Sequence, residues 1–225
     1  MLRCTFLANC GLHLEYAGES ILIDAPNGLR TAFDAVPFEE GERIITGSAP
    51  YDTLLGMFFT HKHSDHYDRS RVRAAAASRP NLVIFAPNGN TEASGSVDLG
   101  VYRVSYFTIP HSGEEFANVY HRVLVVKAGK HCLYITGDAE WDHEAHAKII
   151  QEYRPTAAFW NPNFITHESG RNLLKTVPKN YIYHLPVEAE DTFGFGRKCR
   201  SIYSKMKNEL ENTVLIEEYP TLAEI

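Results

Sequence analysis

Three histidines and one aspartate lie within a single stretch of six residues, directly after an apolar run. Residues 61–66 have the sequence His-Lys-His-Ser-Asp-His. In an extended or turning backbone, side chains at i and i+2 project to one side, so His61 and His63 can contact one ion while Asp65 and His66 turn towards a second position. Imidazole nitrogen and carboxylate oxygen suit Zn²⁺, and they also suit Fe²⁺ and Mn²⁺. The segment predicts a metal site rather than a histidine-rich surface loop.

Further ionisable residues each follow a predicted strand, where a rigid sheet would position ligands. Apolar runs lead to Asp24, His111, Asp138 and His184. Taken singly, each of these residues is equally consistent with a turn or a capped strand end. Taken together, they predict one site to which both halves of the chain contribute.

In this order the residues resemble the metallo-β-lactamase superfamily, whose pattern is a strand-end Asp, then His-x-His-x-Asp-His, then His, Asp and His at later strand ends. The resemblance covers nearly the whole chain. It implies the α+β class, with a four-layer αββα sandwich and two metals at one edge of the sheets. It also implies these roles: His61, His63 and His111 bind the first metal, Asp65, His66 and His184 bind the second, Asp138 bridges them, and Asp24 orients ligands through hydrogen bonds.

The residues after the motif suggest a branch of this superfamily. Tyr67 and Asp68 follow His66, which resembles the branch containing ascorbate-6-phosphate lactonase and the N-acylphosphatidylethanolamine phospholipase D type enzymes. Histidine rather than glutamate at position 63 differs from the oxygen-reducing di-iron branch. We therefore expect a hydrolase that cleaves a small anionic ester, either a phosphodiester or a phosphorylated lactone.

The ligand types indicate a mechanism. Two cations a few Å apart lower the pKa of a bridging water and polarise the substrate oxygen, and Asp65 is expected to be catalytic by accepting the proton or holding the hydroxide in line. We expect two divalent ions, with zinc favoured and manganese or iron compatible. Two alternatives stay open: mononuclear iron oxygen chemistry of the persulfide dioxygenase type, and a metal-loaded binding module without turnover.

Substrate contacts are predicted from two loops. Arg197 and Lys198 follow His184 closely, beyond two glycines, where they would clamp a phosphate or carboxylate; a solvated helix start is an equal alternative. His167 follows a predicted strand and is a candidate to face the site. The other histidines are expected to be structural or solvent-facing: His13 and His121 in strands, His131 beside a turn, and His143 and His146 on a solvated helix face.

Composition limits the partners. The chain has 225 residues, which suits a single domain over residues 1–225, and 22 Lys+Arg against 28 Asp+Glu give a net charge of 22 − 28 = −6. General nucleic-acid-binding proteins carry an excess of basic residues, which this chain does not have. The apolar runs are too short to cross a membrane, and the four cysteines include no CxxC pair. We expect a cytoplasmic protein with a small-molecule substrate; the oligomeric state stays open.

Hydrophobic patterning predicts the elements that position these residues. Residues 27–51 are expected to be an irregular excursion that could overhang the site, and residues 193–200 a loop. The expected strands cover 4–7, 12–16, 20–24, 56–60, 82–86, 101–108, 119–128, 131–136, 157–160 and 181–184, and the expected helices cover 69–78, 141–153, 169–176 and 201–210.

Overall fold

The structure, a computed structural model, describes residues 1–30, 32–87 and 93–225. In spatial order, the first sheet contains β13 (Thr221–Glu224), β1 (Arg3–Ala8), β2 (Gly11–Tyr16), β3 (Glu19–Ile23), β4 (Leu54–Phe58) and β5 (Val83–Phe85). The second contains β12 (Thr213–Leu215), β11 (Asn180–Ile182), β10 (Ala157–Trp160), β9 (His131–Ile135), β8 (Arg122–Ala128), β7 (Tyr102–Thr108) and β6 (Ser94–Leu99). The helices are α1 (Phe38–Thr46), α2 (Arg69–Ser78), α3 (Ala145–Tyr153), α4 (Asn163–Thr166), α5 (Glu168–Leu174) and α6 (Phe195–Met206).

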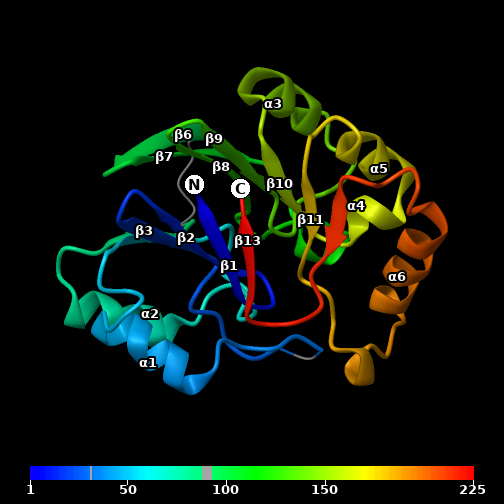
Figure 1. Ribbon diagram of the computed structural model, residues 1–225. Coiled ribbons are helices and arrows are strands. Elements are labelled where there is room, and N and C mark those ends of the chain that lie inside the picture. Colours follow the sequence, from blue (N-terminus) through cyan, green and yellow to red (C-terminus); the bar gives the residue numbers. More distant parts are fainter. Residues whose placement is uncertain (31, 88–92) are drawn as a thin grey trace.

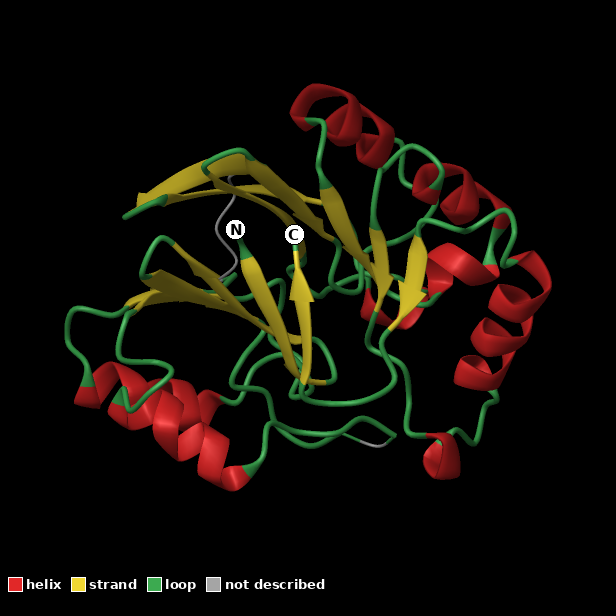
Figure 2. Cartoon of the chain, in the orientation of Figure 1, coloured by secondary structure: helices red, strands yellow, loops and turns green. Residues whose placement is uncertain are grey.

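The two sheets face each other, and helices cover their outer faces (Figures 1 and 2). Helices α1 and α2 lie against the first sheet, whereas α3 to α6 lie on the side of the second. This arrangement confirms the predicted αββα sandwich. Among the described residues, no helix is both long enough and apolar enough to span a bilayer.

Apolar side chains on both faces of each sheet explain the layers. Between the sheets, Phe6 of β1 packs against Phe159 and Tyr181, with ring centroids 5.7 and 5.5 Å away. Outside the second sheet, buried Trp160 packs with Phe164 of α4. Strands buried on both faces are near-continuous apolar runs, as in β8 and β9, because each face needs a cover.

Two segments differ from the sequence-based expectation. Residues 27–51 contain the helix α1, which starts after Pro37, buries Ile44 and ends at Gly47 in the left-handed conformation (φ 70°). The prediction of a wholly irregular excursion was wrong because proline before a helix and glycine after it are also its ordinary end signals. The loop expected at 193–200 is also wrong: α6 already begins at Phe195, where Asp191 accepts hydrogen bonds from the first-turn N–H groups.

Three strands were not predicted: β6, β12 and β13. Each is a terminal strand of its sheet. The sequence of β6 is Ser-Gly-Ser-Val-Asp-Leu, whose low β propensity hides it. Edge strands need only one paired side, so pairing to a neighbour rather than propensity determines them.

The predicted ligands follow strand ends of both sheets at one edge. Asp24 follows β3, His111 comes after β7, Asp138 after β9 and His184 after β11. His111 also forms an isolated bridge with Ala139, which joins two of these strand ends. The sheet ends therefore hold the segments that carry the site.

Candidate metal centre

The seven residues predicted as ligands lie together. Asp138 belongs to two groups in which one ligand atom per residue lies within 4.8 Å of every other. The groups are His61, His63, His111 and Asp138, and Asp65, His66, Asp138 and His184. The arrangement provides two adjacent positions for a cation, with one carboxylate common to both.

Asp138 is the centre of the cluster. Its Oδ2 lies 3.3 Å from His66 Nε2 and 3.4 Å from His111 Nε2, and its Oδ1 lies 3.4 Å from His184 Nε2. Gly137 makes this approach possible because its φ is +50°, and a Cβ there would lie 2.6 Å from Thr60 Oγ1. The backbone of Asp138 can therefore come close to the strand that delivers the first histidines.

Hydrogen bonds fix which nitrogen of each imidazole faces the cluster. An oxygen that can only accept must receive a proton from Nδ1, which leaves the Nε2 lone pair free. The Nδ1 partners are Asp24 Oδ2 at 3.0 Å for His66, the Ser112 carbonyl at 2.7 Å for His111, and Asn9 Oδ1 for His184. In its neutral form, each of the three histidines thus presents an acceptor to the site.

Buried polar atoms without partners support cation binding. Nε2 of His66, Nε2 of His111 and Oδ1 of Asp138 are buried and make no hydrogen bond within the described parts of the chain. Leaving such an atom unpaired costs about 1–3 kcal/mol. Because the converging atoms are acceptors, positive ions satisfy all of them together, so the residues present fit a pair of divalent cations.

The charge states suit the same role. Burial lowers the pKa of His61 well below its usual value, and burial with the Arg30 charge lowers the pKa of His63 to about 4. Both rings are therefore neutral near pH 7. Burial acts to raise the pKa of Asp138, but the adjacent His184 and His66 side chains outweigh burial and hold this pKa well below its usual value. The neutral rings of His61 and His63 therefore lie beside an ionised carboxylate.

Asp24 lies behind the cluster, where it can orient His66. Its carboxylate is fully buried and accepts hydrogen bonds from the Thr60 N–H at 2.7 Å and the Thr60 hydroxyl at 2.8 Å. It also accepts the His66 Nδ1–H described above. Asp24, Asn9 and His184 all have positive φ (48°, 51° and 60°), a conformation that is uncommon for non-glycine residues and that Asn, Asp and His adopt more readily than most.

Three residues around Asp65 were missed by sequence reasoning. Arg30 Nη1 lies 2.9 Å from Asp65 Oδ1, and the Arg30 side chain is one-third exposed (33%). The Asn9 amide and the Cys10 thiol each donate to the Asp65 carbonyl at 3.0 Å. The Asn9-Cys10 segment was interpreted only as a turn, and Arg30 lies in an irregular loop, so no local pattern indicated them.

Two phenylalanine side chains flank the cluster, each in contact with a different group of ligands. Phe33 stacks on His184, with ring centroids 4.2 Å apart and planes at 13°. Phe116 lies 4.6 Å from His111 and 5.1 Å from His63 by the same measure. Phe33 therefore contacts the second group and Phe116 the first.

A pocket of about 490 Å³ opens onto the cluster. It reaches His111, Asp138 and His184 and is walled by segments from four loops. The other described residues that line it are Ala32, Phe33, Ser112, Gly113, Glu115, Phe116, Asn161, Pro162, Asn163, Pro186, Glu190, Asp191, Thr192, Phe193 and Phe195. We take this pocket as the candidate active site because three of the predicted ligands, including the shared Asp138, line it.

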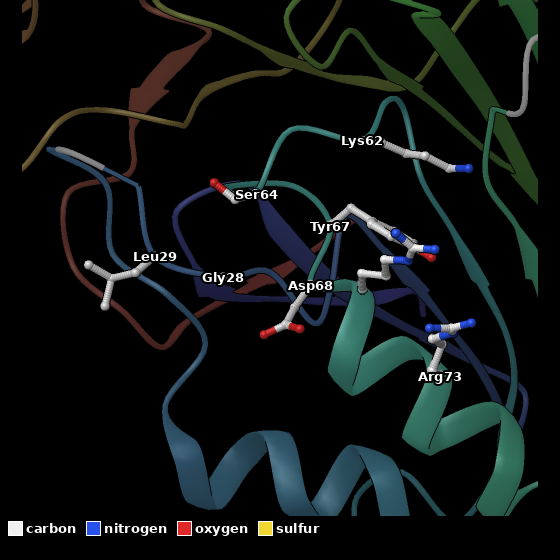
Figure 3. A pocket seen from close by; sticks show the side chains of 8 residues that line it. Gly28, Leu29, Lys62, Ser64, Tyr67, Asp68 and Arg73 are labelled. Carbon is white, nitrogen blue, oxygen red and sulfur yellow. The ribbon is translucent and has the colours of Figure 1, made fainter.

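A larger pocket of about 860 Å³ lies beside the His61–His66 segment but contains none of the predicted ligands. Figure 3 shows Lys62, Tyr67 and Arg73 extending to the same side of it. Lys62 Nζ lies 5.8 Å from the Tyr67 ring centroid, a cation–π contact. The pocket is formed by the start of α2 and the loop at Gly28 and Leu29.

The structure does not bring the three predicted substrate contacts to the active-site pocket. Arg197 and Lys198 are exposed in the first turns of α6, and neither lines the pocket. His167 stacks on Trp141 with ring centroids 4.0 Å apart, outside the pocket lining. Their role in substrate binding stays a prediction.

One other histidine differs from expectation and another agrees with it. His146 is buried rather than solvated: Nε2 donates to the Glu140 carbonyl at 2.8 Å, and Nδ1 accepts from the Tyr134 hydroxyl at 2.5 Å. A helix face was predicted to be exposed, but the second sheet covers this part of it. His121 is buried as expected; its Nδ1 lies 2.9 Å from the Ile109 carbonyl, whereas its Nε2 has no partner among the described residues.

Comparison with solved structures identifies the fold. A possible metal-dependent hydrolase from Veillonella parvula aligns with a TM-score of 0.71 over 100% of both chains at 15% identity. YhfI from Bacillus subtilis, a metallo-β-lactamase fold protein, aligns with a TM-score of 0.64 at 12% identity, covering 99% of this chain and 98% of that one. The chain therefore has the metallo-β-lactamase fold, as the resemblance implied.

The fold also occurs with other chemistry. CmlA from Streptomyces venezuelae, a diiron β-hydroxylase, aligns with a TM-score of 0.69 at 10% identity over 100% of this chain and 54% of that chain. No family model matches the sequence, and no curated protein matches it. The comparisons support the fold and leave the reaction to be argued from the site.

Proposed function

We propose that this protein is a binuclear metal-dependent hydrolase that cleaves a small anionic ester, either a phosphodiester or a phosphorylated lactone. The observation that carries the proposal is the pair of ligand groups that share Asp138. Similarity in fold to structures described as metal-dependent hydrolases supports it. A buried cluster of metal-ligating side chains, three of which line an open pocket, is the arrangement that such a reaction needs.

The two groups divide the ligands between two positions. His61, His63 and His111 would hold one divalent cation, and Asp65, His66 and His184 the other, with Asp138 common to both. Zinc suits this donor set, and manganese and iron are also compatible. When bound, the two ions would supply a water of lowered pKa and a Lewis acid for the substrate oxygen.

The residues of the chain supply orientation and proton transfer. Arg30 holds Asp65 Oδ1, while Asp65 Oδ2 lies 3.8 Å from His184 Nε2. Asp65 is therefore fixed with Oδ2 turned towards the cluster, where it can take up the proton released from the attacking water. Arg30 has N–H groups that are not directed at Asp65, and a guanidinium there can donate to an anionic substrate oxygen.

Substitution of the shared carboxylate tests the proposal. We expect Asp138→Asn and Asp65→Asn to abolish hydrolysis of bis-p-nitrophenyl phosphate while leaving the circular dichroism spectrum unchanged. Asp98→Asn is the matched control because Asp98 is 71% exposed on β6, outside the described lining of the active-site pocket. Undiminished hydrolysis in Asp65→Asn would refute the role of this residue.

A further inference from the structure

Phenylalanine side chains form part of the wall of the active-site pocket. Phe33 contacts a histidine of the second ligand group and Phe116 contacts a histidine of the first. Phe195 lines the same pocket. Pro162 and Pro186 add further apolar surface. Such a pocket favours a flat apolar group, because aromatic rings pack face to edge or offset against one another and exclude water.

The charged groups of the pocket are acidic. Glu115, Glu190 and Asp191 line it, whereas no Lys or Arg does so among the described residues. The Asp191 carboxylate is compensated because it accepts hydrogen bonds from the N–H groups of Phe195 and Arg197. Glu190 accepts from the Ala32 N–H at 3.2 Å. These carboxylates disfavour an additional anionic group on the substrate within the pocket.

Among the described residues, Arg30 is an arginine that contacts a ligand of the cluster, beside the two positions that the cations would occupy. Its guanidinium carbon lies 5.8 Å from the Phe116 ring centroid and its Nη1 contacts Asp65. It is therefore placed between the aromatic wall and the second group of ligands. Arg30 and the bound cations would favour a negative charge next to the scissile bond, whereas Glu115 and Glu190 would disfavour a second charge farther into the pocket.

From this arrangement, and resting on the proposed function, we propose that the substrate is a phosphodiester with an aromatic ester group. This group packs in the part of the pocket lined by Phe33 and Phe116, which we call the slot. A phosphorylated lactone is disfavoured because its phosphate carries two charges and lies away from the scissile bond. It would have to occupy the part of the pocket that Glu115 and Glu190 line.

Binding of two inert phosphinates tests the slot without any turnover. Diphenylphosphinate and dimethylphosphinate are both monoanions with tetrahedral phosphorus and no ester bond. We expect the metal-loaded protein to bind diphenylphosphinate at least about tenfold more tightly by calorimetry, the factor that burial of one phenyl ring gives at the low end. Equal affinities would overturn the inference.

Three variants locate the effect. Phe33→Leu and Phe116→Leu should each lose most of the preference for diphenylphosphinate, whereas Phe38→Leu should retain it because Phe38 is 71% exposed at the start of α1. Metal content of each variant, measured by elemental analysis, controls for loss of the ions. A preference that persists in both Phe33→Leu and Phe116→Leu would refute the assignment of the slot.

The same samples separate this inference from the proposed function. Metal-loaded protein that prefers diphenylphosphinate but does not hydrolyse bis-p-nitrophenyl phosphate would contradict the hydrolase and support the slot. Protein that hydrolyses this diester but binds both phosphinates equally would support the hydrolase and overturn the slot. In active protein, Phe116→Leu should raise KM for bis-p-nitrophenyl phosphate about tenfold with little change in kcat, since the ring binds substrate without contacting the reacting atoms.

Discussion

Two substitutions of Asp24 separate its contribution to folding stability from its contribution to metal binding. In Asp24→Ala, the N–H and hydroxyl of Thr60 and the Nδ1–H of His66 lose their acceptor. In Asp24→Asn, the amide oxygen still accepts from the Thr60 N–H. Its NH₂ group now donates to His66 Nδ1, which forces the proton onto Nε2, the nitrogen that faces the cluster.

The two substitutions should therefore differ in their effects. Three buried donors without an acceptor cost about 3–5 kcal/mol together, since each costs about 1–3 kcal/mol and neighbouring losses are not additive. In Asp24→Asn, the amide still offers hydrogen-bond partners to Thr60 and His66. We therefore expect the free energy of unfolding to fall by only about 1 kcal/mol. Metal affinity should fall about 10–100-fold in Asp24→Asn, the usual effect of losing an orienting partner of a ligand.

Two assays measure these quantities separately. Urea unfolding in the presence of a chelator gives the free energy of unfolding of the metal-free protein, and competition against a chromophoric chelator gives zinc affinity. Asp98→Asn serves as the control for a change of one charge on an exposed side chain. Wild-type zinc affinity in Asp24→Asn would refute the argument that Asp24 sets the tautomer of His66.

Three further predictions concern other parts of the molecule. Burial lowers the pKa of His146 to about 4, so the unfolded chain takes up a proton at a higher pH than the folded chain does. Between pH 6.5 and pH 4, the wild type should therefore lose up to about 3 kcal/mol more unfolding free energy than His146→Gln, as measured by denaturant titration. Gly137→Ala should cost about 2 kcal/mol more unfolding free energy than Gly18→Ala, because both have positive φ but only at Gly137 would a Cβ meet other atoms within 4 Å; equal costs would contradict this. Arg30→Met should lower kcat on bis-p-nitrophenyl phosphate about 100-fold with about 1 kcal/mol or less of destabilisation, since the side chain is 33% exposed; unchanged kcat would exclude Arg30 from the reaction.

The convergence of the predicted ligands could be anticipated because each follows a strand. Alternating and apolar runs predicted β3, β9 and β11 closely, and the residues just beyond their ends lie at one edge of the sandwich. The αββα architecture followed from the ordered motif rather than from the individual elements. The strand patterns thus predicted the convergence of the cluster, and the ordered motif predicted the fold class.

What escaped prediction depends on contacts between distant segments. Arg30 reaches Asp65 across 35 positions of sequence, and Asn9 reaches His184 across 175. Neither lies in a periodic segment, so nothing local marks it. Helix α6 escaped because its first turn depends on the Asp191 side chain, and His146 because the burial of its helix face depends on how the sheet packs against it.

The most direct test of the account is the metal content of the protein purified without added metal, paired with hydrolysis of bis-p-nitrophenyl phosphate by the same sample. The account predicts about two equivalents of divalent metal, zinc or manganese, with turnover that is lost on chelation and restored by metal. One equivalent of iron without hydrolysis would contradict it and would favour oxygen chemistry at a single ion.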